Sequence, residues 1–392
     1  MKKALTVLGL GLGVMTSAHA QSSVTLYGLI DAGVSYINNV RTSAAGRPAV
    51  GGAEFAQQSG AINGSRWGFR GREDLGDGLA ALFVLENGFT VGNGAFSQQG
   101  REFGRQAYMG LSSAQFGTVT LGRQYASMAD FISPFSLTAT GFGGTSAAHP
   151  YDNDDLNNVA RISNTVKYTS IDYRGFKFGG MYAFSNQAGG FNQNSGYSGG
   201  LAYGNGGFSF AAGYMQLDNS SSAGTAVTSA VSGATIGSGR RRVYGAGIGY
   251  TIAKLAVNLV VTQSKYDSVT GVPTSILSTI PVGAYVRFNN FELNARYNFT
   301  PAWSVAAGYT YTQSRESGFS RAGSLGSDSS PKYQLASLNT DYALSKRTDV
   351  YLEGIYGRVS GGSHLGGFGI NGIGQSATNT QVMVTAGMRH RF

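Results

Sequence analysis

The last residues of the chain, 381–392, alternate between apolar and more polar positions with a period of two. Counting back by twos from Phe392 gives His390, Met388, Ala386, Val384 and Val382, whereas Arg391, Arg389, Gly387, Thr385, Met383 and Gln381 lie on the other face. One face suits lipid and the other suits water, which predicts a strand of a membrane-spanning β-barrel. A half-buried strand of a soluble sheet has the same alternation, so the rest of the chain has to distinguish the two.

Runs of about ten residues with this period recur from Val24 to the end of the chain. Residues 242–251, 255–262 and 176–184 are clear examples. Short turns are expected at 75–78, 115–117, 172–175, 205–207, 253–254, 300–302 and 345–347. Long loops are expected near 37–60, 92–103, 127–159, 186–196, 218–239, 266–281, 314–331 and 360–378. This strict alternation of short and long connections predicts an all-β chain of sixteen antiparallel strands, with both termini at the short-turn end.

An open sheet of this size would leave two edges of unpaired backbone groups, which lipid cannot satisfy. We therefore expect the last strand to pair with the first, residues 23–36, and so close a barrel. The outward set of that first strand is Val24, Leu26, Ile30, Ala32 and Val34. A barrel of sixteen strands is too wide for side chains to fill, so its lumen should contain water.

The composition supports this prediction and adds a leader segment. The chain has 60 glycines, 22 tyrosines, 22 phenylalanines, no cysteine and only 12% charged residues, which favours strands joined by turns. Residues 1–20 begin with two lysines, continue through a short apolar run and end in Ala-His-Ala, a pattern typical of a cleaved secretory signal peptide. Residues 21–392 are then one barrel domain. No apolar run is long enough for a transmembrane helix.

The formal net charge is +9, and removal of the two leader lysines leaves +7. Nucleic-acid binding needs clustered basic residues, and the only such run is 240–242, beside a Gly/Ser-rich stretch. After a signal peptide we expect no nucleic-acid partner. The alternative for this run is a position where a strand meets lipid headgroups or lipopolysaccharide phosphates.

Five segments together resemble the general trimeric porins of Gram-negative outer membranes, especially those of beta-proteobacteria. They are SVTLYG at 23–28, SRWGFRG with EDLG at 65–76, GxxxLGRQ at 117–124, YxLSKRT at 342–348 and the terminal Phe392. The resemblance covers the whole chain. It implies a homotrimer of sixteen-stranded barrels in the outer membrane, each pore being narrowed by a third long loop folded inward. It also implies that Phe392 is part of the signal read by the outer-membrane assembly machinery.

The third long loop, 126–159, carries a set of aspartates around a glycine-rich centre; these are Asp130, Asp152, Asp154 and Asp155. If the loop folds into the lumen, these carboxylates face basic residues of the wall. The alternative is an exposed surface loop with solvated aspartates. Strand alternation places Arg66 and Arg70 inward, and likewise Arg161 and Lys167. The resemblance places Arg66, Arg123 and Arg161 together opposite the loop, although each could instead form salt bridges or contact lipopolysaccharide.

The strand around Arg123 fits this scheme poorly. Placing Arg123 inward turns Thr118, Thr120 and Gly122 outward, which is a poor face toward lipid. Either this strand lies at the contact between subunits, where small residues allow close packing, or a β-bulge shifts its phase.

The expected function is passive diffusion of small hydrophilic solutes and ions across the outer membrane, with a preference for anions. A substrate-specific outer-membrane channel is the alternative. We expect no enzyme, because beyond the leader the histidines are only His149, His364 and His390, and no nucleophile motif accompanies them. No cofactor is expected. No metal site is expected either, since the acidic run at 152–155 lacks the glycine and glutamate of a calcium loop. Outer-membrane lipid and lipopolysaccharide are the remaining expected partners.

Overall fold

The computed structural model describes residues 23–43, 49–139, 142–157, 160–186, 188–190, 194–218, 228–229, 236–271, 283–319 and 328–392. The signal peptide predicted at 1–20 lies outside the described residues. The described chain is nearly all β-sheet, as the all-β prediction required.

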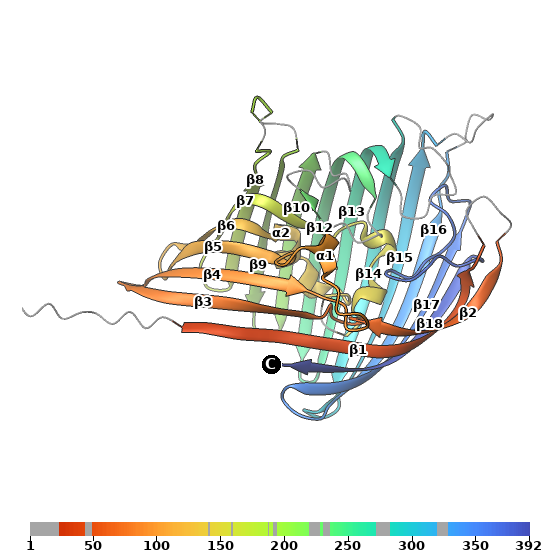
Figure 1. The fold of residues 1–392 in the computed structure, drawn as a ribbon, viewed down its shortest axis with the longest axis horizontal. Helices are drawn as coiled ribbons and strands as arrows, with labels where there is room; N and C mark the ends of the chain where they lie inside the picture. Colours follow the sequence, from red (N-terminus) through yellow and green to blue (C-terminus); the bar gives the residue numbers. More distant parts are fainter. Residues whose placement is uncertain are drawn as a thin grey trace, which may run out of the picture.

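The strands form a single antiparallel sheet, shown in Figure 1. Their bounds are β1 Ser23–Arg41, β2 Gly51–Ser59, β3 Arg66–Gly76, β4 Leu79–Gly88, β5 Gln106–Ser113, β6 Gly117–Tyr125, β7 Arg161–Thr169, β8 Phe176–Ala183, β9 Gly196–Asn205, β10 Phe208–Asp218, β11 Thr228–Ser229, β12 Gly237–Ile252, β13 Leu255–Gly271, β14 Tyr285–Asn298, β15 Trp303–Ser317, β16 Lys332–Ala343, β17 Thr348–Ser360 and β18 Thr380–Arg391. Both β2 and β3 pair with β1, so they are one interrupted strand, and β11 is only a short addition beside β7. The sheet is therefore a closed barrel of sixteen strands, as predicted.

The barrel closes where the sequence pattern indicated. β1 pairs with β18 from Leu29 opposite Arg391 to Ile37 opposite Met383. At the end of the seam, Phe392 and Gly28 exchange backbone hydrogen bonds of 3.0 and 3.1 Å. Figure 1 shows the C-terminal strand lying beside β1. Closure satisfies the backbone groups that an open edge would leave exposed to lipid.

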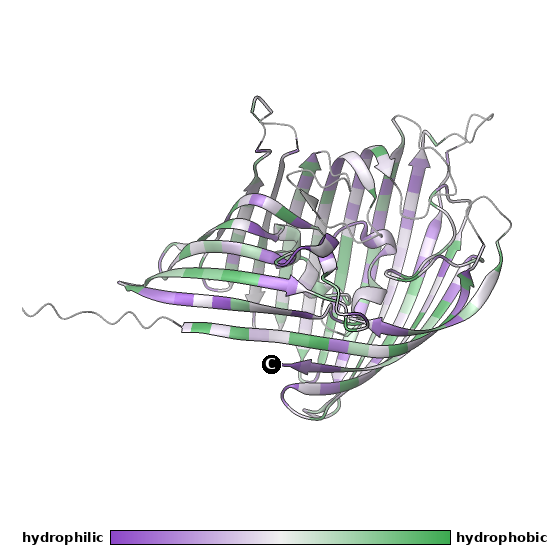
Figure 2. Ribbon diagram, viewed as in Figure 1, coloured by the Kyte–Doolittle hydropathy of each residue, from purple (hydrophilic) through white to green (hydrophobic). Residues whose placement is uncertain are grey.

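Alternation separates the two faces of each strand, as the bands in Figure 2 show. On β14, Phe291 and Leu293 are exposed, whereas Asn290 and Glu292 between and beside them are buried. The terminal strand follows the predicted phase, with Val384, Met388 and Phe392 exposed. The exposed apolar face is thus the outer surface of the barrel, and the polar residues lie on the opposite face of the strands.

A β-bulge resolves the difficulty on β6. The register against β7 shifts between Gly122 and Gln124, and Gly122 has φ +136°, a conformation that favours glycine. Before the bulge, Leu121 is exposed and Thr120 is buried, which is a normal lipid-facing phase. The alternative in which a bulge shifts the phase is therefore correct, and no subunit contact is needed to explain the strand.

In the residues that the structure describes, short helices lie between strands. They are α1 Ser97–Gly100, α2 Ser127–Phe131 and the 3-10 turns Ser133–Phe135, Thr145–Ala147 and Pro150–Asp152. Within the described part of the chain, none of the helices has the length and apolar character needed to cross a membrane.

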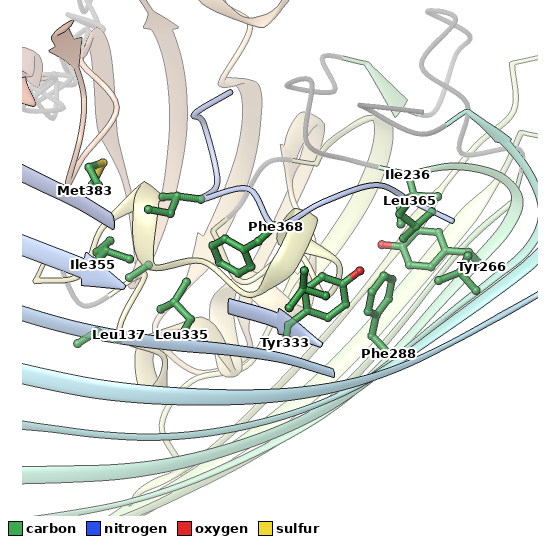
Figure 3. Packing of buried hydrophobic residues seen from close by; sticks show 14 of the residues in the cluster. Leu137, Ile236, Tyr266, Phe288, Tyr333, Leu335, Ile355, Leu365, Phe368 and Met383 are labelled. Atoms are coloured by element: carbon green, nitrogen blue, oxygen red, sulfur yellow. The ribbon is translucent and has the colours of Figure 1, made fainter. Parts of the chain in front are cut away.

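Apolar side chains pack where these segments meet the strands. Figure 3 shows one cluster, in which Leu137 of the 126–159 segment and Phe368 of the segment between β17 and β18 lie near wall residues such as Tyr333, Leu335 and Ile355. A second cluster joins Met128, Phe131 and Ile132 to Met215 and Val243 of the wall. Two of the long connections are thus packed against the barrel wall.

Candidate functional site

The segment 126–159 is attached to the wall through a buried histidine. His149 lies between two carboxylates, with Nδ1 at 2.6 Å from Asp154 and Nε2 at 2.9 Å from Glu292 of β14. Glu292 also accepts hydrogen bonds from Ser136 Oγ at 2.7 Å and from the Leu137 backbone N–H at 2.6 Å. The carboxylate of the wall residue Glu292 thus holds three points of the segment, and Asn290 of the same strand also donates to Asp154 at 3.2 Å.

Charge pairing controls the protonation of this group. Burial alone would lower the pKa of the His149 imidazole, but Asp154 and Glu292 raise it to about 10. Burial would likewise raise the pKa of Asp154, but the charge and hydrogen bond of His149 lower it. A charged histidine between two carboxylates is therefore the neutral-pH state of this attachment.

The two neighbouring aspartates are also buried. Asp152 Oδ1 accepts the Asn157 N–H at 3.0 Å, and Asp155 Oδ1 accepts the Ala160 N–H at 2.7 Å. Burial raises the pKa of Asp152, and it raises that of Asp155 to about 6. The side chain of Arg241 donates to the backbone oxygen of Asp152 at 3.2 Å.

These placements correct one expectation from the sequence. Asp152, Asp154 and Asp155 are 1%, 0% and 0% exposed, so they do not face an open pore. They are hydrogen-bond acceptors that fold the segment and join it to the wall. Strand periodicity cannot predict this, because it carries no information about which carboxylates a non-repetitive loop will bury.

The tip of the segment rests on the interruption between β2 and β3. The Thr145 N–H donates to the Ala61 backbone oxygen at 3.1 Å, and Gly144 lies so close that a Cβ there would be 2.1 Å from Ile62 Cα. The inserted residues are held in turn by Asp31, whose Oδ2 accepts the backbone N–H groups of Ile62 and Asn63.

Beside this tip lies a cavity of about 550 Å³. Three arginines line it, namely Arg66 of β3, Arg161 of β7 and Arg105, which directly precedes β5. Thr138 and Asn157 of the 126–159 segment line the same cavity. Among the described residues that form its surface, none is acidic.

Arg105 is the arginine that sequence reasoning missed. Its Nε lies 2.6 Å from Glu86 Oε1, and its NH2 group donates to the Tyr125 hydroxyl at 2.9 Å. Arg161 lies over the ring of the same tyrosine, at 5.4 Å from the ring centroid. Arg105 lies outside the strands, so periodicity assigned it to neither face. The sequence does contain one indication of a cation here. Glu86 is an acidic residue at a lumen-facing strand position, and a buried carboxylate at such a position requires a cationic partner.

The other predicted site residues lie elsewhere. Arg123 is buried, and it donates from Nε to the Gly104 backbone oxygen and from NH1 to the Arg161 backbone oxygen. Lys167 of β7 forms an ion pair with Asp130 of the 126–159 segment. Arg70 lies over the Tyr27 ring at 5.3 Å. None of these residues lines the cavity.

In the part of the chain that the structure describes, no three His, Cys, Asp or Glu side chains are grouped so that they could hold a metal ion.

The similarity to known proteins extends over the whole chain. A model of the Gram-negative porin family matches residues 4–362. An outer membrane porin protein of Bordetella pertussis is 33% identical, and outer membrane porin protein 32 of Delftia acidovorans is 29% identical, each over 100% of both chains. A solved structure described as an anion-selective porin from Comamonas acidovorans has the same fold, with a TM-score of 0.71 and 24% identity over 95% of this chain and 100% of the other. The chain belongs to the Gram-negative porin family.

Proposed function

We propose that this outer-membrane porin is a water-filled channel for passive diffusion of small hydrophilic solutes, that it prefers anions, and that the segment 126–159 lies inside the barrel and forms the constriction. The observation that carries the anion preference is the cavity lined by Arg66, Arg105 and Arg161 without an acidic residue in its described lining.

The segment contacts particular faces of the strands, and these contacts support its position inside the barrel. Ser136, Leu137 and His149 bond to Glu292, which alternates with the exposed residues Phe291 and Leu293. In a closed barrel the face opposite the exposed apolar side chains is the lumen. The segment therefore contacts strands from the lumen side.

The charge of the proposed constriction follows from its lining. Arginine as a residue type keeps its charge over the physiological pH range, and its planar fork can bind a carboxylate or phosphate through two hydrogen bonds. Glu86 lies behind Arg105 rather than in the lining, and it partly offsets one of the three charges. The remaining positive potential attracts anions and repels cations of the same size.

The test is the reversal potential of the protein in a planar lipid bilayer under a KCl gradient. We expect the sign that corresponds to chloride permeating faster than potassium. Zero selectivity or cation selectivity would contradict the anion preference. Current that saturates at low concentrations of one solute would instead favour the substrate-specific channel.

The proposal includes no catalysis. His149 is the histidine nearest the cavity lining in sequence. It is 1% exposed, and its two ring nitrogens contact the carboxylates of Asp154 and Glu292. A general base has to reach a substrate, and this one does not.

We also propose a homotrimer that binds outer-membrane lipid and lipopolysaccharide and is inserted by the outer-membrane assembly machinery. Native mass spectrometry of detergent-extracted protein tests the trimer.

A further inference from the structure

Arg296 on β14 faces the lumen, but it is not among the described residues that line the arginine cavity. It lies four residues beyond Glu292 on the same face of the strand, whereas Leu293 between them is exposed on the outer face. Its partners in register on the neighbouring strands are Ala256 and Ala306, which leave room for a large side chain. A strand rises about 3.3 Å per residue, so Arg296 lies roughly 13 Å from Glu292 toward the short turns.

This arginine lies on the wall opposite the cavity. β5, which Arg105 directly precedes, and β14 are separated by β6, β7, β8, β9, β10, β12 and β13. That is half of the circumference of a sixteen-stranded barrel. The positive charges of the lumen are therefore not confined to one side.

The guanidinium group of Arg296 is stacked on an aromatic ring of the 126–159 segment. Its central carbon lies 3.7 Å from the centroid of the Phe142 ring, which is direct contact with the ring face. Phe142 is two residues from Gly144, where the tip of the segment rests on the interruption between β2 and β3. The segment that forms the proposed constriction thus covers one face of this guanidinium group and fixes its plane.

The hydrogen-bonding edge of the same group is not used by the described residues. Arg296 forms no ion pair with them, and its Nε is buried without a hydrogen-bond partner among them. Asp341, whose carboxylate attracts it electrostatically, is paired with Arg389, and Arg389 also pairs with Asp349. Arg296 is only partly buried, so the rest of its edge can be reached from the lumen.

A stacked arginine with an unused edge recognises oxyanions better than halides. Two parallel N–H groups of the fork match two oxygens of a carboxylate or phosphate, whereas chloride is a single centre. The ring holds the fork in place, which lowers the entropy lost when an anion binds. We propose, on the basis of the channel function proposed above, that Arg296 and Phe142 form a site for the carboxylate or phosphate groups of small organic anions on the short-turn side of the constriction.

Two substitutions separate the charge of this site from its shape. Arg296→Lys keeps the charge but has no planar fork, and Arg296→Gln removes the charge. Each full-length variant is placed in a planar bilayer, and its folding is checked by heat-modifiable gel migration. The first measurement is the reversal potential under a KCl gradient. The second is the concentration of citrate, a small tricarboxylate, that halves the KCl current. Lys254→Gln, in an exposed short turn, is the control for net charge.

We expect Arg296→Lys to keep the reversal potential of wild type and to raise the half-blocking citrate concentration at least about threefold, because the paired hydrogen bonds are lost. Arg296→Gln should raise that concentration about tenfold and lower the ratio of chloride to potassium permeability about twofold. Phe142→Leu should raise the citrate concentration about threefold without changing the permeability ratio, because the fork loses its support. The control should change either quantity less than about 1.5-fold.

The chain has no cysteine, so Arg296→Cys introduces a single thiol that tests access from the pore. A cationic methanethiosulfonate reagent should restore the permeability ratio of this variant but not its block by citrate. Leu293→Cys on the outer face of the same strand is the matched control, and the reagent should leave its current unchanged. A current through the Arg296→Cys variant that does not respond to the reagent would place residue 296 outside the pore and overturn the proposal.

The remaining outcomes distinguish this site from the channel function itself. A wild type that prefers chloride to potassium, but that citrate blocks no better than it blocks Arg296→Lys and Arg296→Gln, would overturn the site alone. A loss of block in Arg296→Gln but not in Arg296→Lys would show that charge suffices and would contradict the role of the fork. A wild type without anion preference would refute the proposed function instead. If the Arg296 variants fail to fold, unchanged citrate block in Phe142→Leu would overturn the site.

Discussion

The three arginines of the cavity have different neighbours, and this difference determines how each contributes. Arg105 is 7% exposed, and it is fixed by Glu86 and Tyr125. Arg161 is held against the tyrosine ring. Arg66 lies on β3, in register with Gly88 at the end of the strand that carries Glu86. Arg105 thus supplies a fixed charge whose partner lies outside the lining.

We expect Arg105→Gln to lower the ratio of anion to cation permeability several-fold. The substitution removes one positive charge and leaves Glu86 without its cation. One unit charge at 4 Å is worth about 1 kcal/mol in water, which is roughly a fivefold effect on local ion concentration. Glu86→Gln should change the ratio in the opposite direction. Reversal potentials measure both.

Lys254→Gln is the control for overall charge, since Lys254 lies in an exposed turn and donates to the Phe299 backbone oxygen at 2.9 Å. If Arg105→Gln behaved like this control, the cavity would not be the constriction.

At the scale of elements, the segment 126–159 is held at two separate places. One is the ion-paired group of His149, Asp154 and Glu292, and the other is the contact of Gly144 and Thr145 with the interruption between β2 and β3. Ordered loops usually need such fixed points, since their backbones have no ladder of their own. Each of the two attachments can be removed separately by a single substitution.

Replacing His149 with Gln should destabilise the barrel by about 3 kcal/mol at pH 6, because it leaves Asp154 and Glu292 buried without their cation. The pKa of His149 is about 10 in the folded protein, above its ordinary value of 6.5. Its stabilisation is therefore complete below about pH 6.5, declines as the unfolded chain loses its proton, and is lost as the pH rises through about 10.

The measurement is the difference in unfolding free energy between wild type and His149→Gln at a series of pH values. The difference should shrink steadily from pH 6.5 to pH 10. Groups that do not interact with His149 titrate in the same way in both proteins and cancel. A difference that did not vary with pH would contradict a charged His149.

Gly144→Ala tests the second attachment. Gly144 has φ +54°, and an added Cβ would meet the Ile62 backbone, which cannot move aside like a flexible side chain. We expect a loss of about 2 kcal/mol in stability and greater noise in the single-channel current, as the tip leaves its contact. Gly362→Ala is the matched control, because nothing lies within 4 Å of its Cβ position. Equal effects of the two substitutions would show that the tip contact is unimportant.

At the scale of the whole molecule, stability depends on closure. The β1–β18 seam joins the two ends of the chain, and the Phe392 ring covers Gly28, where an added Cβ would lie 2.3 Å from the ring. Phe392 itself remains 41% exposed on the outer surface. Phe392 therefore contributes modestly to the packing of the seam, and its ring is also accessible to another protein.

Phe392→Ala should separate these two roles. In refolding into detergent without other proteins, we expect nearly normal yield, because the backbone hydrogen bonds of the seam remain. In cells, the amount of barrel in the outer membrane should fall strongly if the assembly machinery reads this residue. Heat-modifiable gel migration measures both yields. A similar fall in both would assign Phe392 a structural role only.

Much of the fold could be predicted because the same physical requirement applies to every strand of a barrel in lipid. Each strand must show apolar side chains outward at every second position, so residues such as Val34, Leu293 and Met388 reveal their face locally. Closure between β1 and β18 follows from the same requirement on backbone groups. The bulge at Gly122 was predictable only as one of two alternatives, because phase alone does not distinguish a shifted register from a subunit contact.

The repeating pattern of the chain was enough to predict the barrel, its strand number and its seam, since these depend on local periodicity and on the satisfaction of backbone hydrogen bonds. Which charges meet depends on the tertiary structure. It brought Arg105 beside Glu86 and buried Asp152, Asp154 and Asp155. Those contacts join residues far apart in the chain through a non-repeating loop, which leaves no periodic signal.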